Sequence, residues 1–231
     1  MPIVDVAPVE IPVTPAGRNW EGGYVGGALG FGFGGDDTVG LQAFDGSGPI
    51  GRATDITDVK ISGVTGSAHV GYRWQRGQWV VGPNLAAELS GISDSSSGSF
   101  SLNGFDYDTT VESEIKSVID LTLKTGYLVD PTTMIYGVAG VSRGSFNYSF
   151  ETTGTGAGSF SGSSSEDFTS TGYVLGFGVE RAFSDRLSGF GEFNYRSYGT
   201  NDITTPLAVG DGTTRATPSH SAIKLGVNYA F

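Results

Sequence analysis

Two histidines are the residues best suited to acid–base chemistry in this chain. They are His69 and His220, and Ser221 follows His220 directly, so a nucleophile and a base are adjacent in sequence. Such a pair must share a hydrogen bond, but adjacent residues of a β-strand point to opposite faces. Residues 219–231 alternate as a strand does, and His69 has no obvious serine nucleophile near it. The histidines therefore predict no hydrolytic site.

A glycine motif and two acidic pairs could bind ligands, but their surroundings do not favour it. Residues 30–35 read G-x-G-x-x-G, yet a dinucleotide site needs a helix there, and the following DDTVGLQAFDGSGP predicts none. Asp106 with Asp108, and Glu166 with Asp167, offer oxygen ligands for calcium without a complete loop pattern. Two histidines and two methionines make no specific haem site. We expect no cofactor and no metal.

Composition excludes several further classes of protein. Cysteine is absent, which excludes disulfides, thiol chemistry, a cysteine-based metal site and a lipid anchor on an N-terminal cysteine. The formal charge of −11 argues against nucleic acid as a partner. No stretch approaches the roughly 20 consecutive apolar residues that a membrane-spanning helix needs.

The last residues of the chain reveal the element that must position any site. Residues 219–231, SHSAIKLGVNYAF, carry apolar side chains at alternate positions and small or polar ones between them. Because strand side chains alternate faces, one face of this strand is wholly apolar. A soluble sheet must bury such a face against another sheet, whereas in a membrane the hydrocarbon covers it.

The same alternation of apolar with small or polar residues recurs along the chain and predicts eight strands. Their ranges are 20–34, 62–74, 78–92, 114–128, 134–148, 169–183, 187–199 and 219–231. In the fourth and fifth strands the pattern places Ile115, Met134, Tyr136 and Val138 on the apolar outer face.

The connections between these strands alternate in length. Long acidic or Ser/Gly-rich loops are predicted over 35–61, 93–113, 151–168 and 201–218, with short turns between the other pairs. Both ends of the chain then lie on the short-turn side, as in outer-membrane proteins with short periplasmic turns and long external loops. The sequence predicts an all-β fold, an eight-stranded antiparallel up-and-down transmembrane β-barrel.

We expect two regions along the chain: a flexible periplasmic N-terminal lead over 1–18 and the barrel over 19–231. The opening MPIVDVAPVEIPVTPAGRNW has no basic n-region and no apolar h-region. It is therefore interpreted as a mature N-terminus on which Met1 replaces a removed secretion signal.

Charged residues recur on the predicted inner face of the barrel. An eight-stranded barrel is just wide enough for side chains to fill, and an unpaired charge there costs several kcal/mol, so these residues should pair. The pattern favours a salt-bridged plug over a gated small pore or a catalytic lumen. The predicted lumenal network comprises Arg73, Glu88, Glu114, Lys116, Asp120, Lys124, Arg143, Glu180, Glu192, Arg196 and Lys224.

Three blocks carry a family resemblance: NWEGGYVGGALGFGFG near the start, TGYVLGFGVERAFSDRLSGFGEFNYRSYG at 171–199, and the terminal IKLGVNYAF. They resemble the alphaproteobacterial family of small outer-membrane barrels, surface antigens related to opacity proteins and to the OmpA transmembrane domain. The resemblance implies insertion by the barrel-assembly machinery. It also implies that Leu225, Val227, Tyr229 and Phe231 form the C-terminal signal which that machinery recognises.

These observations lead to one functional hypothesis and two alternatives. The chain is expected to be a monomeric, non-enzymatic outer-membrane protein that contributes to envelope integrity and surface interactions through four long acidic loops. Its expected partners are outer-membrane lipids, lipopolysaccharide and neighbouring envelope proteins. The alternatives are a small water- or ion-conducting pore gated by lumenal salt bridges, and a lipid-modifying enzyme with an exposed Ser/His pair on one face.

Overall fold

The computed structural model describes residues 18–45, 47–102, 105–155, 159–199, 201–207, 210–216 and 218–231. Residues 1–17 of the predicted lead therefore lie outside the described residues. The described strands are β1 (Gly22–Asp45), β2 (Gly48–Arg76), β3 (Trp79–Leu102), β4 (Phe105–Asp130), β5 (Thr133–Thr155), β6 (Ser159–Ala182), β7 (Leu187–Tyr198), β8 (Asn201–Leu207), β9 (Gly210–Ala216) and β10 (Ser219–Ala230).

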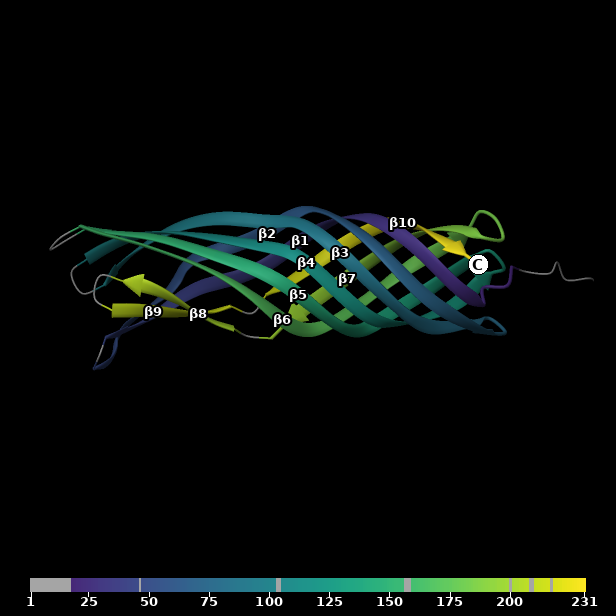
Figure 1. The fold of residues 1–231 in the computed structure, drawn as a ribbon, viewed down its shortest axis with the longest axis horizontal. Helices are drawn as coiled ribbons and strands as arrows, with labels where there is room; N and C mark the ends of the chain where they lie inside the picture. Colours follow the sequence, from purple (N-terminus) through teal and green to yellow (C-terminus); the bar gives the residue numbers. More distant parts are fainter. Residues whose placement is uncertain are drawn as a thin grey trace, which may run out of the picture.

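Eight of these strands close into a ring, which confirms the predicted fold (Figure 1). Strands β1 to β7 pair antiparallel in chain order, β10 pairs with β7, and β10 closes the ring against β1 from Tyr24↔Ala230 to Phe33↔Ser221. Closure leaves no unpaired edge in this part of the sheet, as a barrel in lipid requires. No helix able to cross a membrane occurs in the part of the chain that the structure describes.

The segments predicted as long loops are largely strands, which corrects that prediction. Residues 35–45 belong to β1, while β4 runs for 26 residues and β2 for 29, far beyond the ~9–11 residues that cross a bilayer. The fourth predicted loop contains the hairpin β8–β9, and β9 pairs with β1. Composition suggested loops because Ser and Gly are poor strand formers, but a neighbouring strand pairs with the backbone along most of these segments.

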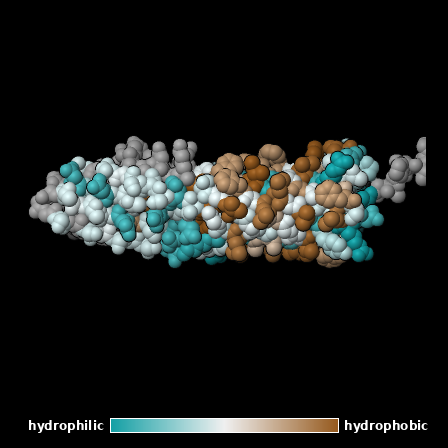
Figure 2. Space-filling model, turned by 90° about the horizontal axis from the view of Figure 1, so that it is seen from above, coloured by the Kyte–Doolittle hydropathy of each residue, from teal (hydrophilic) through white to brown (hydrophobic). Residues whose placement is uncertain are grey.

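The outer surface of the molecule divides into an apolar belt and a polar extension (Figure 2). The belt surrounds the end that holds the short turns, and Leu29, Phe177 and Leu225 are each more than 60% exposed on it. A thin polar rim lies beyond the belt on the short-turn side (Figure 2). The barrel thus spans the bilayer at one end and projects a long polar sheet from the other.

A β-bulge in β4 corrects the predicted direction of several side chains. Ile115 pairs with Phe146 and Ser117 with Ser145, so Lys116 is an extra residue. One inserted residue moves every following side chain to the opposite face. Ile115, predicted to face outward, is therefore buried, and Glu114 and Lys116, predicted to face inward, are exposed.

In the first half of β5, the residues that face inward and those that face outward are the reverse of those predicted. Met134, Tyr136 and Val138 are buried inside, while Ile135 and Val141 face outward at 50% and 54% exposure. Both sets are apolar, so alternation alone could not distinguish them, and the partners inside the barrel decide. Arg143 shares the outward phase of Val141 and is exposed, which corrects its predicted lumenal position.

Candidate functional site

The lumenal charges form three groups, and the one nearest the short turns joins β2 to β6. The Arg73 guanidinium donates to both carboxylate oxygens of Glu180, at 3.1 Å and 2.7 Å. The Ser188 hydroxyl donates a further hydrogen bond to Glu180 at 2.5 Å. Arg73 also lies over the Tyr24 ring, 4.0 Å from its centroid, so both its charge and its planar face are engaged.

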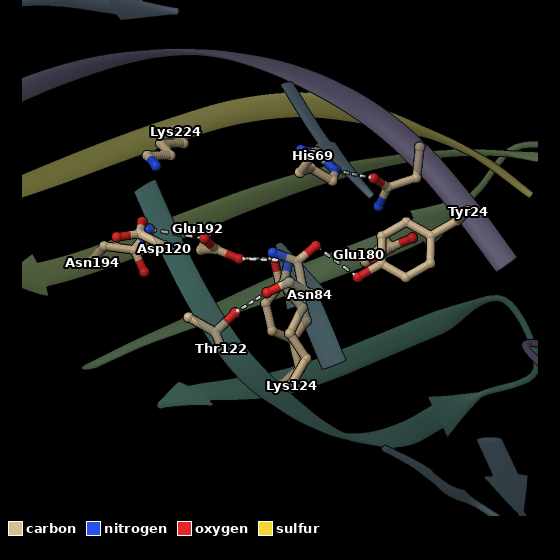
Figure 3. A network of polar contacts seen from close by, with 12 residues as sticks. Tyr24, His69, Asn84, Asp120, Thr122, Lys124, Glu180, Glu192, Asn194 and Lys224 are labelled. Carbon is tan, nitrogen blue, oxygen red and sulfur yellow. Dashed lines mark hydrogen bonds and ion pairs between the residues drawn. The ribbon is translucent and has the colours of Figure 1, made fainter. Parts of the chain in front are cut away.

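The middle group is centred on Glu192 of β7 (Figure 3). Lys124 of β4 lies 2.9 Å from Glu192 Oε2, and the Tyr136 hydroxyl donates to the same oxygen at 2.9 Å. The Asn194 amide donates to the other carboxylate oxygen at 2.8 Å. Nearby, Tyr24 donates to Asn84 at 2.9 Å (Figure 3), which extends the polar contacts across the lumen.

The third group surrounds Arg196, whose side chain has no exposed surface. Its guanidinium lies 2.6 Å from Asp120 and 3.3 Å from Glu88, and Lys224 forms an ion pair with Glu88. His220 lies 3.3 Å from Arg196 through its Nε2 atom. One buried cation therefore holds carboxylates from β3 and β4 together.

Eight of the eleven predicted network residues thus lie together in the lumen, four cations and four anions among the described residues. Each belongs to an ion pair with a buried partner, so the lumen carries no net charge from this set. Pairing of this kind offsets the cost of removing the charges from water. The set comprises Arg73, Glu88, Asp120, Lys124, Glu180, Glu192, Arg196 and Lys224.

The remaining three residues of the predicted network lie outside the lumen. Lys116 forms an exposed ion pair with Asp167 of β6 at 2.7 Å, beyond the bulge that also turns Glu114 outward. Arg143 pairs in the ladder with Ile119 and Thr171 and faces outward with them. The prediction was wrong for these residues for two reasons. It continued the same inward–outward alternation through the bulge in β4, and it exchanged the inward and outward positions of β5.

Apolar side chains lie in the lumen on both sides of the charges. The cluster in the polar extension, here called the upper plug, contains Ile61, Ile92, Val111, Ile115, Val118, Phe146, Tyr148, Phe150 and Tyr198. The cluster at the short turns, here called the lower plug, contains Trp20, Val80, Leu128, Met134, Tyr136 and Val138. Trp20 is fixed there because its Nε1 donates to the Pro131 carbonyl at 3.2 Å. The charges are therefore enclosed.

Sequence reasoning missed the aromatic contribution to these plugs. Tyr136 was assigned to the outer face, and Phe146, Tyr148 and Phe150 lie where an indistinct strand end was expected. A signal was present, because these three aromatics stand at alternate positions in the sequence. They are buried on one face of β5, as that spacing implies.

The histidines do not form a nucleophile–base pair. His220 is buried and stacks beside Tyr198, while Ser221 occupies the opposite face of β10. His69 Nε2 lies 2.6 Å from Asn228 Oδ1, over Gly26 of the strand β1 that separates them. Both rings therefore contact polar or aromatic neighbours within the barrel.

The other candidate ligand motifs also lie within strands. The G-x-G-x-x-G segment is part of β1, where a Cβ on Gly32 would come within 2.2 Å of the Ile92 side chain. Asp106 and Asp108 accept hydrogen bonds from Ser101 and Ser99 across the β3–β4 ladder. Among the residues described, no three His, Cys, Asp or Glu side chains converge on a possible metal position.

The comparisons with known proteins agree with this geometry. A family model described as the outer membrane protein beta-barrel domain matches residues 10–231. The chain belongs to this family. The chain therefore resides in the bacterial outer membrane, with the short turns on the periplasmic side and the polar extension outside.

Two relatives and one solved structure illustrate the outer-membrane family. The 31 kDa outer-membrane immunogenic protein of Brucella melitensis biotype 1 is 25% identical over 225 residues, covering 97% of this chain and 88% of that protein. The 22 kDa outer membrane protein of Rhizobium leguminosarum bv. viciae is 28% identical over 222 residues, covering 96% and 82%. OprG of Pseudomonas aeruginosa has a TM-score of 0.56 at 15% identity, covering 91% and 96%. The predicted alphaproteobacterial resemblance is confirmed.

The residues of the expected assembly signal line the outer face of β10 at the periplasmic end of this outer-membrane barrel. Leu225, Val227, Tyr229 and Phe231 are each at least 45% exposed. The Phe231 N–H donates to the Gly23 carbonyl at 3.1 Å, so the last residue also joins the closing strands. Arg186 donates to the Tyr229 hydroxyl at 3.2 Å, and this contact raises the pKa of the guanidinium. Their recognition by assembly machinery stays a prediction.

Proposed function

We propose that this outer-membrane β-barrel is a non-enzymatic protein that contributes to envelope integrity and presents its polar extension to the cell surroundings. The filled lumen carries the proposal: buried charges are paired, and an apolar plug lies on each side of them. An enzyme or a transporter needs a site that its substrate can reach, whereas a filled barrel suits a structural role.

The extension supports the surface part of the proposal. Its outer face carries exposed acidic side chains, including Asp106, Asp108, Glu112, Glu151 and Glu166. A sheet of this length and charge stays soluble beyond the bilayer and can meet other molecules. A related protein is named an outer-membrane immunogenic protein, which fits a chain whose outer part is accessible. Lipopolysaccharide, with divalent cations between its phosphates and these carboxylates, is a proposed neighbour.

A small pore gated by the salt bridges is the second candidate, and one observation favours it. Glu88 Oε1, Asn194 Oδ1 and Asn228 Nδ2 are buried in the lumen with no hydrogen-bond partner among the described residues. Buried polar atoms of this kind are usually satisfied by ordered water. A continuous file of such waters would conduct only if the plugs open.

Conductance in planar lipid bilayers separates the two functions. The purified barrel is expected to give no steady, discrete openings, since water and ions must pass both plugs. Replacing Val118 and Phe146 of the upper plug and Met134 and Val138 of the lower plug with Ala should thin both plugs, and this variant shows whether conduction can be detected. Discrete openings of the unmodified protein that disappear on changing Lys124 or Glu192 would overturn the closed barrel in favour of the gated pore.

One cellular and one biochemical measurement test the role in envelope integrity and the absence of enzymatic activity. A strain lacking the protein should become more sensitive to detergents and large antibiotics, and the intact chain should restore resistance. Unchanged sensitivity would contradict the role in envelope integrity. Mass analysis of lipid A after incubation with the purified protein should show no change, whereas loss of an acyl chain would reveal a lipid-modifying enzyme.

A further inference from the structure

A groove of about 950 Å³ crosses the lipid-facing wall of the barrel towards its periplasmic end. Its lining comes from strands β3 to β7 and from β10, and it is almost entirely apolar. The principal side chains around it are Trp79, Tyr127, Ile135, Phe177, Val179 and Phe193. A smoothly convex barrel wall would contact lipid acyl chains evenly all round. A groove of this size therefore gives one part of the wall a different contact with lipid.

The hollow exists because small residues stand between large ones on neighbouring strands. Gly137 of β5 pairs with Phe177 of β6, and Gly191 of β7 pairs with Val179. Within the barrel, Gly137 is not required by packing, because an added Cβ would meet only the Gly176 carbonyl oxygen, at 4.0 Å. Its lack of a side chain therefore keeps the groove open.

A cation stands at the periplasmic mouth of this groove. Arg181 is the next outward residue after Val179 on β6, and it pairs with Thr133 and Gly189 on the flanking strands. The side chain is exposed, and no ion pair with another described residue engages it. The Phe183 side chain, 67% exposed, follows at the same rim. An aromatic and an arginine at this height mark the level of lipid head groups.

We propose that the groove binds one phospholipid of the periplasmic leaflet with an acidic head group. Its acyl chains lie against the apolar lining, and its phosphate accepts hydrogen bonds from Arg181. A guanidinium offers two parallel donors to phosphate oxygens. An acidic head group has no cation of its own to offset the phosphate charge, as choline does, so the charge of Arg181 gives this position a head-group preference that hydrocarbon contact alone cannot supply. The inference goes beyond the proposed function, since a pore or a closed barrel could equally carry such a lipid.

Native mass spectrometry of the refolded full chain, titrated with phosphatidylglycerol or phosphatidylcholine in detergent, tests the groove. The unmodified protein should retain one phosphatidylglycerol in preference to phosphatidylcholine. Gly137→Leu fills the groove and should reduce retention of both lipids about tenfold. Gly66→Leu is the matched control, because Gly66 lies on the outer wall away from the groove, where an added Cβ meets only Leu29, at 4.0 Å.

A second pair of variants tests the head-group contact. Arg181→Gln should abolish the preference for phosphatidylglycerol and reduce its retention more than that of phosphatidylcholine, because only the phosphatidylglycerol head group carries a net negative charge. Arg143→Gln, at an outward position far from the groove, should leave the preference intact. Heat-modifiable migration on gels verifies folding. Thr125 also lines the groove, so Thr125→Leu replaces Gly137→Leu if that variant does not fold. The proposal would be overturned if the groove-filling variant and its Gly66→Leu control retained equal amounts of lipid. It would also be overturned if Arg181→Gln kept the preference for phosphatidylglycerol.

Discussion

Arg196 shows how a single side chain organises the interior of this barrel. It is fully buried, contacts Asp120 and Glu88 on two other strands, and lies beside His220. Removing one partner from a buried ion pair leaves an uncompensated charge, which costs much more than the intact pair contributes. By contrast, Arg143 was predicted to share this environment and instead faces outward without a buried carboxylate.

The contrast between these arginines gives a prediction about stability. Arg196→Met should lower the free energy of unfolding by about 3–5 kcal/mol, because Asp120 loses the cation of its buried ion pair. Arg143→Met removes the same group from an exposed position and should change stability by about 0.5 kcal/mol or less. Urea titration in lipid vesicles, followed by tryptophan fluorescence, measures both. Equal losses would contradict the assignment of the two arginines to opposite faces.

Two strands acquire their orientation from pairing rather than from their own sequence. In β4 the extra residue Lys116 reverses the phase of everything beyond it, so Val111 and Ile115 enter the upper plug. In β5 both faces are apolar near the turn, and Tyr136 points inward, where its hydroxyl reaches Glu192. When both faces of a strand are apolar, the more stable orientation is the one in which its polar atoms find hydrogen-bond partners.

The lack of cysteine permits a direct test of these phases. Single cysteines at Glu114 and Arg143 should react readily with a water-soluble maleimide, since both positions are exposed. Cysteines at Ile115 and Ser142, each the buried neighbour of one of these, should react roughly tenfold more slowly or less, because the folded barrel protects them. Faster labelling at Ile115 than at Glu114 would mean that β4 has no bulge.

At the scale of the whole molecule, polarity is separated along the barrel axis. The apolar belt lies at the periplasmic end and the polar extension lies outside (Figure 2). Inside the barrel, the eight paired lumenal charges cancel and lie between the two plugs. The first and last strands meet at a seam where Phe231 donates to Gly23. The expected assembly signal therefore lies on the strand that closes the ring.

This position leads to a prediction about assembly. Deleting Phe231 should sharply reduce the amount of folded barrel in the outer membrane of cells, because the machinery loses the terminal aromatic it is proposed to recognise. Phe183→Ala is the control, since Phe183 is another exposed phenylalanine at the periplasmic end. The amount of heat-modifiable protein in isolated membranes measures both. If the variant without Phe231 assembled normally, the proposal that the assembly machinery recognises this terminal residue would be wrong.

The sequence by itself determined the eight strands of the barrel, their up-and-down order and the outer face of most of them. Leu225 and Leu29 must meet hydrocarbon whichever strands lie beside them, so their alternation is a local signal. The alternation along the sequence also pointed to the eight lumenal charges that the structure brings together, including Arg196 and Glu180, but the same reasoning placed Glu114, Lys116 and Arg143 in the lumen, where they do not lie.

Tertiary structure alone decided which cation meets which anion, where β4 bulges and how far the strands extend. Arg73 reaches Glu180, 107 positions away in sequence, through the closure of the ring. The bulge at Lys116 and the phase of Tyr136 depend on neighbours across the sheet, and residues 93–102 form a strand because β4 offers them a ladder. A hydrogen-bonded partner is a property of the assembled sheet, and no single strand encodes it.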